Sequence, residues 1–333
     1  MYLNHNFRCP ETLSPLSLTI TKQEGDRVIE GYLVSENGTK YPIIEGLPYL
    51  LFPAELPQEE QDIIGWYERN YASYDQFLPL TFQTFGVDEQ QERLRMIDQL
   101  DIQPHHKVLE TGAGTGRDSM LIAKRLGKDG ELHVHDIFDK ILKLSYDKLE
   151  EVEVPVTYTI SNAIYLPYPD NYFDVYYHFG GFNTFSDKKR AFAEISRVVK
   201  PGGKVIVGDE SMPAWLRERD FGKILINSNP HYNYELPLAY MHESARNVKI
   251  EYIIGGVFYY IYYTVGEGDP YADFDFEIPG PRGGTHRTRY FGHLEGVSQE
   301  AIEMASKAFA KSGKSMHKWL DDVIRDAAKA ELS

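Results

Sequence analysis

The residues best suited to chemistry lie in the segment V-L-E-T-G-A-G-T-G-R-D, residues 108–118. It is an apolar strand that ends in Glu110 and runs into glycines at alternate positions, which let a ligand approach the backbone. These glycines are Gly112, Gly114 and Gly116. A triphosphate loop would need Gly-Lys-Ser/Thr, but Arg117 and Asp118 follow here. A dinucleotide site would be spaced G-x-G-x-x-G, and the carboxylate would repel a pyrophosphate. The segment favours a ligand that carries a positive charge.

The segments around this motif predict a mainly parallel sheet. Strand-like and helix-like patterns alternate from residue 107 to residue 210. The expected strands are 107–111, 131–138, 156–161, 172–179 and 204–210. The expected helices are one that follows the first strand and runs to about residue 126, one near 139–150 and one at 187–199. This alternation indicates right-handed βαβ units whose strands end at one common edge, where open sheets bind ligands. Residues 248–254 and 257–265 flank a Gly-Gly turn and predict an antiparallel hairpin.

With these elements in place, residues 60–265 resemble the class I S-adenosylmethionine-dependent methyltransferases. The first motif of that family is an acid followed by G-x-G-x-G, which Glu110 and the three glycines match. The next three motifs are matched in order by V-H-D-I-F at 134–138, S-N-A-I-Y-L-P-Y-P-D-N-Y-F-D-V at 161–175 and K-P-G-G at 200–203. Four ordered matches are much more specific than one glycine motif.

The resemblance implies S-adenosylmethionine as the cofactor, with the glycines beside its methionine and ribose portions. It implies that Asp136 binds the ribose hydroxyls and that Ile137 and Phe138 pack on the adenine. Asn162, followed by Ala163, stands where the family usually has Asp. Its amide oxygen can accept the same hydrogen bond from the adenine amino group.

An aromatic segment, W-Y-E-R-N-Y-A-S-Y-D at 66–75, precedes the sheet. In similar methyltransferases such a helix covers the methionine end of the cofactor. Tyr67, Tyr71 and Tyr74 are spaced i, i+4 and i+7, so they share one helix face. We assign Tyr71 and Tyr74 to the cofactor and Tyr67 to the acceptor. Packing of the same side chains in the core agrees equally well with the pattern.

Candidate acceptor residues follow the fourth and fifth strands. His178 is a candidate general base because histidine titrates near neutral pH, with a purely structural role as the alternative. Methyl transfer to a good nucleophile can also rely on positioning alone. The insertion at 209–245 predicts an aromatic acceptor pocket or a lid with its own core. The predicted acceptor-binding residues are Tyr67, Asn183, Trp215, His231, Tyr232 and His242. No histidine spacing predicts a metal site.

Residues 1–54 predict a small antiparallel β unit that resembles a zinc ribbon found alone or fused to RNA and protein methyltransferases. The matches are F-R-C-P at 7–10, G-Y-L-V-S-E-N-G at 31–38 and Y-P-I-I-E-G-L-P-Y-L-L at 41–51. That family has further cysteines near positions 12, 34 and 37. Cys9 is the single cysteine here, so tetrahedral zinc cannot be assembled.

The C-terminal tail, residues 269–333, resembles a ribbon-helix-helix module. The pattern predicts a strand over 285–294 and helices over 298–311 and 315–329, with a break at Gly313. In that family the strand pairs with its copy in a second subunit, which implies a homodimer, and often reads DNA. Arg287 and Arg289 would alternate onto one face of the strand. A role in dimerisation or packing is favoured in so acidic a chain.

Charge and composition limit the classes of partner. The 333 residues include 35 Lys and Arg against 50 Asp and Glu, a net charge of −15, which argues against broad binding to nucleic acid. No apolar run reaches the roughly 20 residues of a membrane span. A single cysteine excludes an intramolecular disulfide, so we expect a cytoplasmic protein.

We therefore predict a Rossmann-like α/β fold with a seven-stranded class I sheet at 105–268. The β unit at 1–54 and a helical cap at 55–104 precede it, and the small α/β tail follows. The predicted activity is methyl transfer from S-adenosylmethionine to an O, N, S or C atom of a small organic acceptor. Two alternatives stay open. One is methylation of tRNA, rRNA or a translation protein, and the other is a cofactor-sensing DNA-binding protein.

Overall fold

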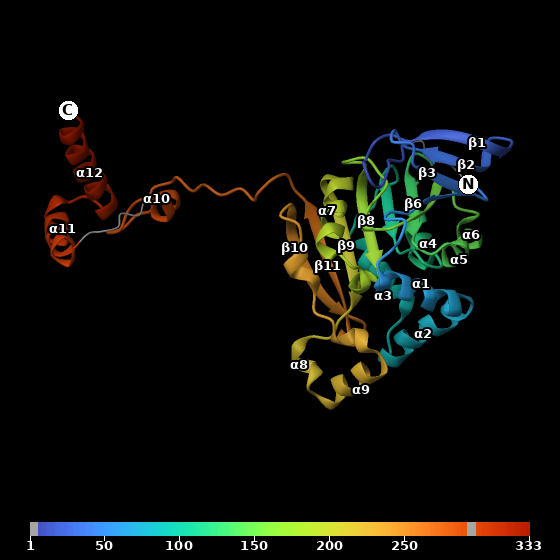
Figure 1. Cartoon of the computed structure of the whole chain (residues 1–333). Helices are drawn as coiled ribbons and strands as arrows, with labels where there is room; N and C mark the ends of the chain where they lie inside the picture. The colour runs from blue at the N-terminus through green and yellow to red at the C-terminus, as the bar shows by residue number, and fades with distance from the viewer. Residues whose placement is uncertain (1–5, 292–297) are drawn as a thin grey trace. The chain divides into compact units, whose positions relative to one another are not determined.

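The computed structural model of the chain describes residues 6–291 and 298–333. It forms two compact units, residues 1–269 and residues 270–333 (Figure 1). The first unit is an α/β structure built on one large sheet. Its strands are β1 Ser17–Glu24, β2 Arg27–Val34, β3 Lys40–Ile44, β4 Leu47–Leu50, β5 Lys107–Thr111, β6 Glu131–Asp136, β7 Val156–Ser161, β8 Phe173–Phe179, β9 Val199–Glu210, β10 Ala245–Ile253 and β11 Phe258–Val265.

The strand order is β1-β2-β3-β4-β7-β6-β5-β8-β9-β11-β10. Strands β7, β6, β5, β8 and β9 are parallel, and the hairpin β10–β11 joins β9 antiparallel, as the sequence pattern predicted. The chain leaves β5 toward β6 and later returns to β8 on its other side. The loops after β5 and β8 therefore diverge at the carboxyl edge, which is the position where open α/β sheets bind ligands.

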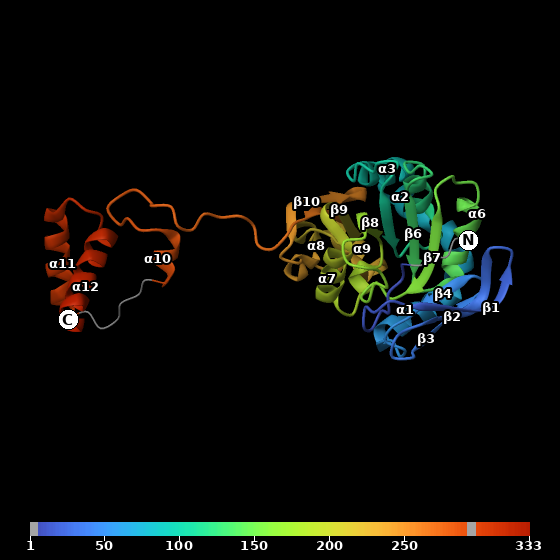
Figure 2. The same ribbon diagram turned by 90° about the horizontal axis from the view of Figure 1, so that it is seen from above.

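The predicted seven-stranded sheet is too small, because the sheet has 11 strands. The N-terminal strands continue it, since β4 pairs in parallel with β7 through Tyr49 and Ile160 (Figure 2). Without β4, the N–H and C=O groups along one side of β7 would be open to other chains. Leu47 and Leu50 of β4 are fully buried, so the β unit shares the cores of the sheet.

Hydrogen bonds hold the turns of the β unit. Cys9 is buried, and its sulfur lies 3.4 Å from the Tyr41 hydroxyl. Ser35 and Thr39 close the second turn through a backbone hydrogen bond of 3.0 Å. Within the described ranges, no group of three or more His, Cys, Asp or Glu side chains is placed to hold a metal. In the same ranges no helix is both long and apolar enough to span a membrane.

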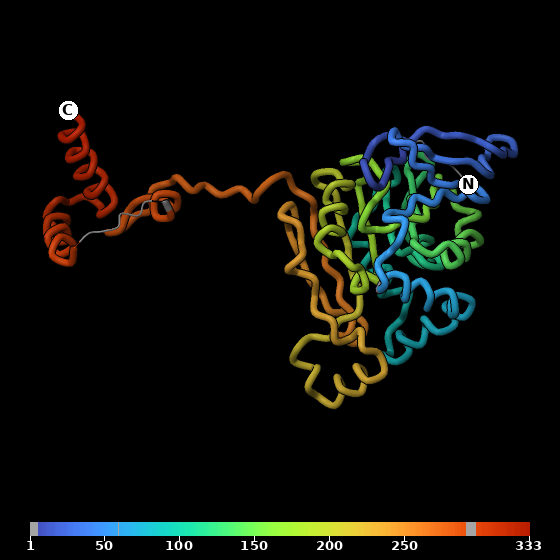
Figure 3. The backbone as a smooth tube through the Cα atoms, viewed as in Figure 1, coloured from blue at the N-terminus to red at the C-terminus, as the bar shows by residue number. Residues whose placement is uncertain are grey.

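Helices cover both faces of the sheet and its carboxyl edge. They are α1 Gln58–Asn70, α2 Tyr74–Phe85, α3 Glu89–Asp98, α4 Arg117–Ala123, α5 Asp139–Lys143, α6 Tyr146–Leu149, α7 Lys188–Val198, α8 Ala214–Arg217 and α9 Asp220–Ser228. Short 3-10 turns are η1 Tyr71–Ser73, η2 Phe182–Thr184, η3 Pro230–Asn233, η4 Pro237–Tyr240 and η5 Ile254–Gly256. The cap α1–α3 and the insertion α8–α9 lie at the same end of the sheet (Figure 3). Phe85 of α2 packs there against the small core around Tyr232.

The second unit contains α10 His286–Phe291, α11 Gln299–Ser312 and α12 Met316–Leu332. The two long helices agree with the predicted ones, and their N-cap serines accept hydrogen bonds from backbone amides, as in capped helices. The predicted strand at 285–294 is wrong over its described part, where α10 forms instead. Thr285 accepts a hydrogen bond from the amide of Thr288 and starts this helix. Residues 292–294 lie outside the described residues.

The arginines of this helix are held locally. Arg287 binds Asp275 at 2.8 Å, and Arg289 donates to the carbonyl oxygen of Gly283. They therefore do not line one face of a strand, as the DNA-binding alternative required.

Candidate active site

The glycine loop leaves β5 at the carboxyl edge of the sheet. Gly112, Gly114 and Gly116 have positive φ angles of 62°, 55° and 78°, which side chains rarely adopt. A Cβ on Gly112 would lie 2.9 Å from Cε1 of His178, and one on Gly116 would lie 2.6 Å from Cβ of Ser145. The loop is therefore wrapped closely around its neighbours, while the backbone at Gly112 stays exposed.

Glu110 lies beneath this loop and is 2% exposed. Its Oε2 has no hydrogen-bond partner in the described part of the chain. Burial raises the pKa of Glu110 well above its usual value, and the nearby Asp118 adds to the effect. Burying a carboxylate whose oxygen lacks a hydrogen-bond partner raises the free energy of the folded chain. A cationic ligand would offset that cost. The buried Glu110 side chain therefore fits the positively charged cofactor that the sequence predicted.

Asp136, at the end of β6, joins the second strand to the glycine loop. Its Oδ2 accepts from the amide of Gly114 at 2.9 Å, and its Oδ1 accepts from the amide of Phe138 at 3.0 Å. Burial raises the pKa of Asp136, although these backbone donors work against that rise. Ile137 is partly buried beside it. The Asp136 carboxylate thus ends β6 beside the glycine loop, and its binding of the ribose hydroxyls stays a prediction.

Three cap tyrosines converge on this edge although a 3-10 turn interrupts their helix. Tyr67 and Tyr71 contact the ring of Phe138 at centroid distances of 6.3 and 6.2 Å, and Tyr67 lies 5.8 Å from Tyr74. Burial raises the pKa of Tyr67, and the charges of Asp136 and Asp209 raise it further. The charges of the acids that end β6 and β9 therefore both act on the Tyr67 hydroxyl.

A carboxylate on α2 fixes the cap to the glycine loop. Asp75 accepts hydrogen bonds from Thr115 Oγ1 at 2.6 Å, Arg117 Nε at 3.0 Å and Lys148 Nζ at 2.8 Å. Burial alone would raise the pKa of Asp75, but these three donors outweigh it and lower the pKa to about 2. Sequence reasoning did not select this residue, although it directly follows Tyr74.

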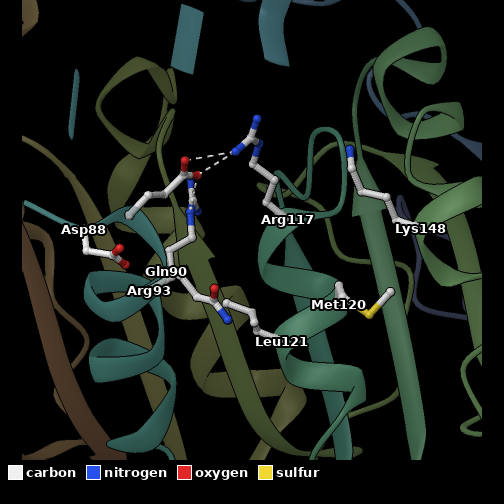
Figure 4. Close-up of a pocket in the computed structure, with 8 residues that line it drawn as sticks. Asp88, Gln90, Arg93, Arg117, Met120, Leu121 and Lys148 are labelled. Carbon is white, nitrogen blue, oxygen red and sulfur yellow. Dashed lines mark hydrogen bonds and ion pairs between the residues drawn. The ribbon is translucent and has the colours of Figure 1, made fainter. Parts of the chain in front are cut away.

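Asp75 and its three donors are called the Asp75 clamp. A second group of ion pairs lies beside this clamp and lines a pocket between α3 and α4 (Figure 4). Glu89 binds Arg117 through both oxygens, at 2.9 and 3.0 Å, and also binds Arg93 at 2.9 Å. Arg93 continues to Asp118 at 2.6 Å. The pocket lining is thus occupied by charges that neutralise one another and tie α3 to α4.

Asn162 directly follows β7 and precedes the buried Ala163. Its Oδ1 accepts from the amide of Ile164 at 3.0 Å, and its Nδ2 donates to Glu60 of α1 at 2.9 Å. Glu60 is buried and also accepts from the Ser186 hydroxyl. Both ends of the Asn162 amide are therefore engaged by the protein itself, and a carboxylate reaches this position from the cap helix. No local sequence signal links Glu60 to this position.

At the end of β8, His178 supports the glycine loop. Its Nδ1 lies 2.9 Å from Thr111 Oγ1, and its ring packs against Phe182 and Phe185. It is buried, and burial lowers the pKa of His178 to about 4. A base this weak and this enclosed is poorly suited to take a proton near neutral pH. These features favour the structural alternative for His178.

Beyond it, Gly180 and Gly181 border open space, since a Cβ on either would meet no atom within 4 Å. Asn183 is buried and organises the acids that end β9. Its amide N–H donates to Asp209 at 2.5 Å, and its side-chain amide donates to the carbonyl oxygen of Glu210 at 2.6 Å. Asn183 was expected to bind the acceptor, but its side chain is used to position this acid pair.

The structure brings only some of the predicted insertion residues to the site. His231 lies next to Glu210, and the buried Tyr232 contacts the ring of Phe258. Trp215 is at the same end of the sheet, where it is 72% exposed and packs on Tyr252 of β10. His242 instead binds Ser244, just before β10 begins.

The start of β10 lies at the opposite edge of the sheet. Ala245 pairs with Val265, and the adjoining Thr264 pairs with Lys204 near the start of the β9 ladder. His242 is therefore remote from the acids that end β9, and its assignment to the acceptor is not supported.

Comparisons with known proteins identify the family of the chain. Residues 58–219 match the model of the ubiE/COQ5 methyltransferase family. The chain is 30% identical over 231 residues to the ubiquinone/menaquinone biosynthesis C-methyltransferase UbiE of Hydrogenovibrio crunogenus, a match that covers 65% of this chain and 90% of that protein. It is 39% identical over 111 residues to the protein of the same name from Cupriavidus pinatubonensis, covering 33% of this chain and 46% of that one.

Solved structures give matches of lower identity. A phosphoethanolamine N-methyltransferase of Haemonchus contortus in complex with S-adenosylmethionine is 12% identical, with a TM-score of 0.49 and coverage of 74% of this chain and 71% of that one. A SAM-dependent methyltransferase from Aquifex aeolicus is 18% identical, with a TM-score of 0.39 and coverage of 54% and 94%. On the strength of the UbiE match and the family model, the chain belongs to the ubiE/COQ5 methyltransferase family and is a class I methyltransferase that uses S-adenosylmethionine.

Proposed function

We propose that this enzyme methylates a ring carbon of a hydroxylated aromatic acceptor of the quinol type. The full-length relatives are named as C-methyltransferases of ubiquinone and menaquinone biosynthesis. The observation that carries the proposal is the position of Gly180 and Gly181, where an added Cβ would meet no atom within 4 Å, just after β8 and between the neighbouring strands β5 and β9. A flat acceptor held there would have the cofactor site on one side and proton-accepting groups on the other.

The residues that would hold the cofactor surround the glycine loop. The exposed backbone at Gly112 and the buried oxygen of Glu110 that lacks a hydrogen-bond partner suit the cationic portion of the cofactor. Asp136 suits the ribose hydroxyls. Phe138 with the cap tyrosines suits the adenine and the methionine end. When bound, S-adenosylmethionine supplies an electrophilic methyl group on a sulfonium. The protein has to orient the acceptor and exclude water.

Activity on a defined acceptor tests this proposal. We expect the enzyme to add one methyl group to a para-hydroquinone that has an alkyl side chain and an unsubstituted ring carbon. The assay is mass spectrometry under reducing conditions, with NMR to locate the new methyl group. The oxidised quinone should be inert, because it has no hydroxyl group to make the ring carbon nucleophilic. Methylation on oxygen, or equal reaction of the quinone, would contradict a C-methyltransferase of quinols.

The Asp75 clamp should control cofactor affinity. We expect Asp75→Asn to weaken S-adenosylmethionine binding by about tenfold, because a charged hydrogen-bond network contributes roughly 1.5 kcal/mol or more. Calorimetry measures the affinity, and hydrogen exchange should show faster opening of α2. Asp62→Asn, an exposed acid of α1 in the same cap, is the matched control. If Asp75→Asn and Asp62→Asn bind S-adenosylmethionine equally well, the Asp75 clamp does not control cofactor affinity.

The clamp also predicts a pH dependence. The pKa of Asp75 is lower in the folded chain, at about 2, than its usual value of 3.8. Its carboxylate therefore stabilises the docked cap fully above pH 3.8 and loses this effect as the pH falls toward 2. Protection of α2 in hydrogen exchange should fall across this window in the wild type. The change should be smaller in Asp75→Asn.

The contact between Glu60 and Asn162 predicts that the carboxylate and the amide can exchange positions without loss of cofactor affinity. We expect Asn162→Asp alone to weaken cofactor binding by about tenfold at neutral pH, because two carboxylates would then face each other. Adding Glu60→Gln restores one donor and one acceptor, so the double variant should recover most of the affinity. Glu60→Gln alone is the control and should change little. Additive effects in this double-mutant cycle would show that the two residues are not coupled.

A further inference from the structure

A carboxylate and an imidazole lie together at the acceptor end of the site. Oε2 of Glu210, the last residue of β9, is 3.5 Å from Nδ1 of His231 in η3. Asn229 bridges the two residues. Its Nδ2 donates to Oε1 of Glu210 at 3.2 Å, and its Oδ1 accepts from the amide of His231 at 3.1 Å. This arrangement directs Nδ1 of the ring toward the carboxylate and leaves Nε2 as the atom that can accept a proton.

The pair is anchored from below by buried groups. Asn183 holds the carbonyl oxygen of Glu210 and the side chain of Asp209, which also accepts from the amide of Glu210 at 2.8 Å. Asp209 is buried, and burial together with the charge of Glu210 raises the pKa of Asp209 above its usual range. The position of Glu210 is thus fixed by the sheet, whereas His231 reaches it from the insertion.

The pair lies at the same carboxyl edge of the sheet as the glycine loop, because β5, β8 and β9 are neighbouring parallel strands. The charge of Glu210 acts on Tyr67 and on Tyr74, both of which lie in the cap near Asp136. The β9 end is also next to the β8 end, since the amide of Gly180 donates to the carbonyl oxygen of Gly208 at 2.9 Å. Among the charged and titratable groups near His231, Asp209 and Glu210 of β9 act on its pKa, and its ring packs against Tyr234 at a centroid distance of 5.5 Å. Arg217 of α8 donates to the carbonyl oxygen of Tyr234.

We propose that His231, held by Glu210, is the general base that takes the hydroxyl proton of the acceptor. The proton moves from the acceptor oxygen to Nε2 of His231, which leaves a phenolate with a nucleophilic ring carbon. That carbon forms the new C–C bond to the methyl group, and the C–S bond breaks with its electron pair kept by sulfur. The ring carbon then loses its hydrogen as a proton to water, and His231 returns its proton to the oxygen. One proton is released overall.

Two features support this role over the alternatives at the same edge. The hydrogen bond that the His231 ring donates to Glu210 raises the pKa of His231, although partial burial acts against it, so the imidazole is a stronger base than an isolated histidine. Its side chain is also 46% exposed and can be reached by an acceptor. His178 has neither property, because it is enclosed and its pKa is lowered to about 4.

The inference rests on the proposed function, so the first experiment measures turnover of the alkyl hydroquinone against pH. We expect His231→Asn to lose most of kcat and to abolish the acidic limb of the profile, with unchanged affinity for S-adenosylmethionine. Glu210→Gln should move that limb to lower pH, because the pKa of His231 falls when the carboxylate is removed. His242→Asn is the matched control, since it changes a histidine at the opposite edge, and its profile should follow the wild type. An unchanged limb in His231→Asn would overturn the proposal.

A second experiment needs no turnover and separates this inference from the proposed acceptor. Para-nitrophenol absorbs at longer wavelength as the phenolate, so its ionisation can be read while it binds to the enzyme with S-adenosylhomocysteine. The wild type should bind it as the phenolate at a pH below the pKa of the free phenol, and His231→Asn should not. The same fraction of phenolate in both proteins, or none in the wild type, would overturn the base assignment. If the nitrophenol is ionised but the hydroquinone is not methylated, only the proposed acceptor is wrong.

Discussion

Replacing Asp136 with alanine is expected to weaken S-adenosylmethionine binding by about 100-fold, since hydrogen bonds to a charged group contribute about 3 kcal/mol when lost together. Two effects combine at this residue. The ribose hydroxyls would lose their acceptor, and the glycine loop would lose the oxygen that holds the amide of Gly114 at 2.9 Å. Calorimetry with S-adenosylmethionine and with S-adenosylhomocysteine should show the same loss, because the two ligands share the ribose.

Asp170→Ala is the matched control for this measurement. Asp170 is also an acid beside a parallel strand, but it lies where β8 begins, pairs with Arg197 and is 67% exposed. An exposed ion pair contributes little, so binding should not change. Asp136→Asn keeps one acceptor oxygen and should fall between the alanine variant and the wild type. If Asp136→Ala binds the cofactor as tightly as Asp170→Ala does, the acid of β6 has no part in the cofactor site.

Local sequence patterns predicted the central part of this structure well. The spacing of Glu110 and the three glycines is a property of a few consecutive residues, and the turn they form follows from it. The strands of the parallel sheet were recognisable for a similar reason, because both of their faces are buried and they read as short apolar runs. The antiparallel hairpin was marked by Gly255 and Gly256, which both have positive φ angles.

Contacts between distant segments had no such signal. The pairing of β4 with β7 depends on how the β unit packs, and Tyr49 and Ile160 are more than a hundred residues apart in the sequence. Glu60 reaches Asn162 over a similar separation, and Glu210 meets His231 only because the insertion folds back. The segment T-H-R-T-R at 285–289 also imitated a strand, but the Thr285 cap starts a helix there instead.

Replacing Gly112 with alanine should have an effect of similar size through the shape of the backbone. Its φ of 62° is in the left-handed region, which costs an alanine roughly 1 kcal/mol. The added Cβ would also lie 2.9 Å from Cε1 of His178, a ring that Thr111 and its aromatic neighbours hold in place. Overpacking of this kind costs about 1–3 kcal/mol, so cofactor affinity should fall by up to about 100-fold.

Gly202→Ala is the control that separates the backbone strain of a positive φ from the steric contact of an added Cβ. Gly202 has a φ of 82° and no atom within 4 Å of an added Cβ, and it lies in β9 away from the carboxyl edge. This variant should lose a little stability and no affinity.

Adding His178→Ala to Gly112→Ala removes the ring that the new Cβ would strike, so the double variant should bind more tightly than Gly112→Ala alone. If it does not, the glycine serves contact with the ligand rather than close packing on His178. The His178→Ala variant should also keep the acidic limb of the pH profile, because His231 sets that limb.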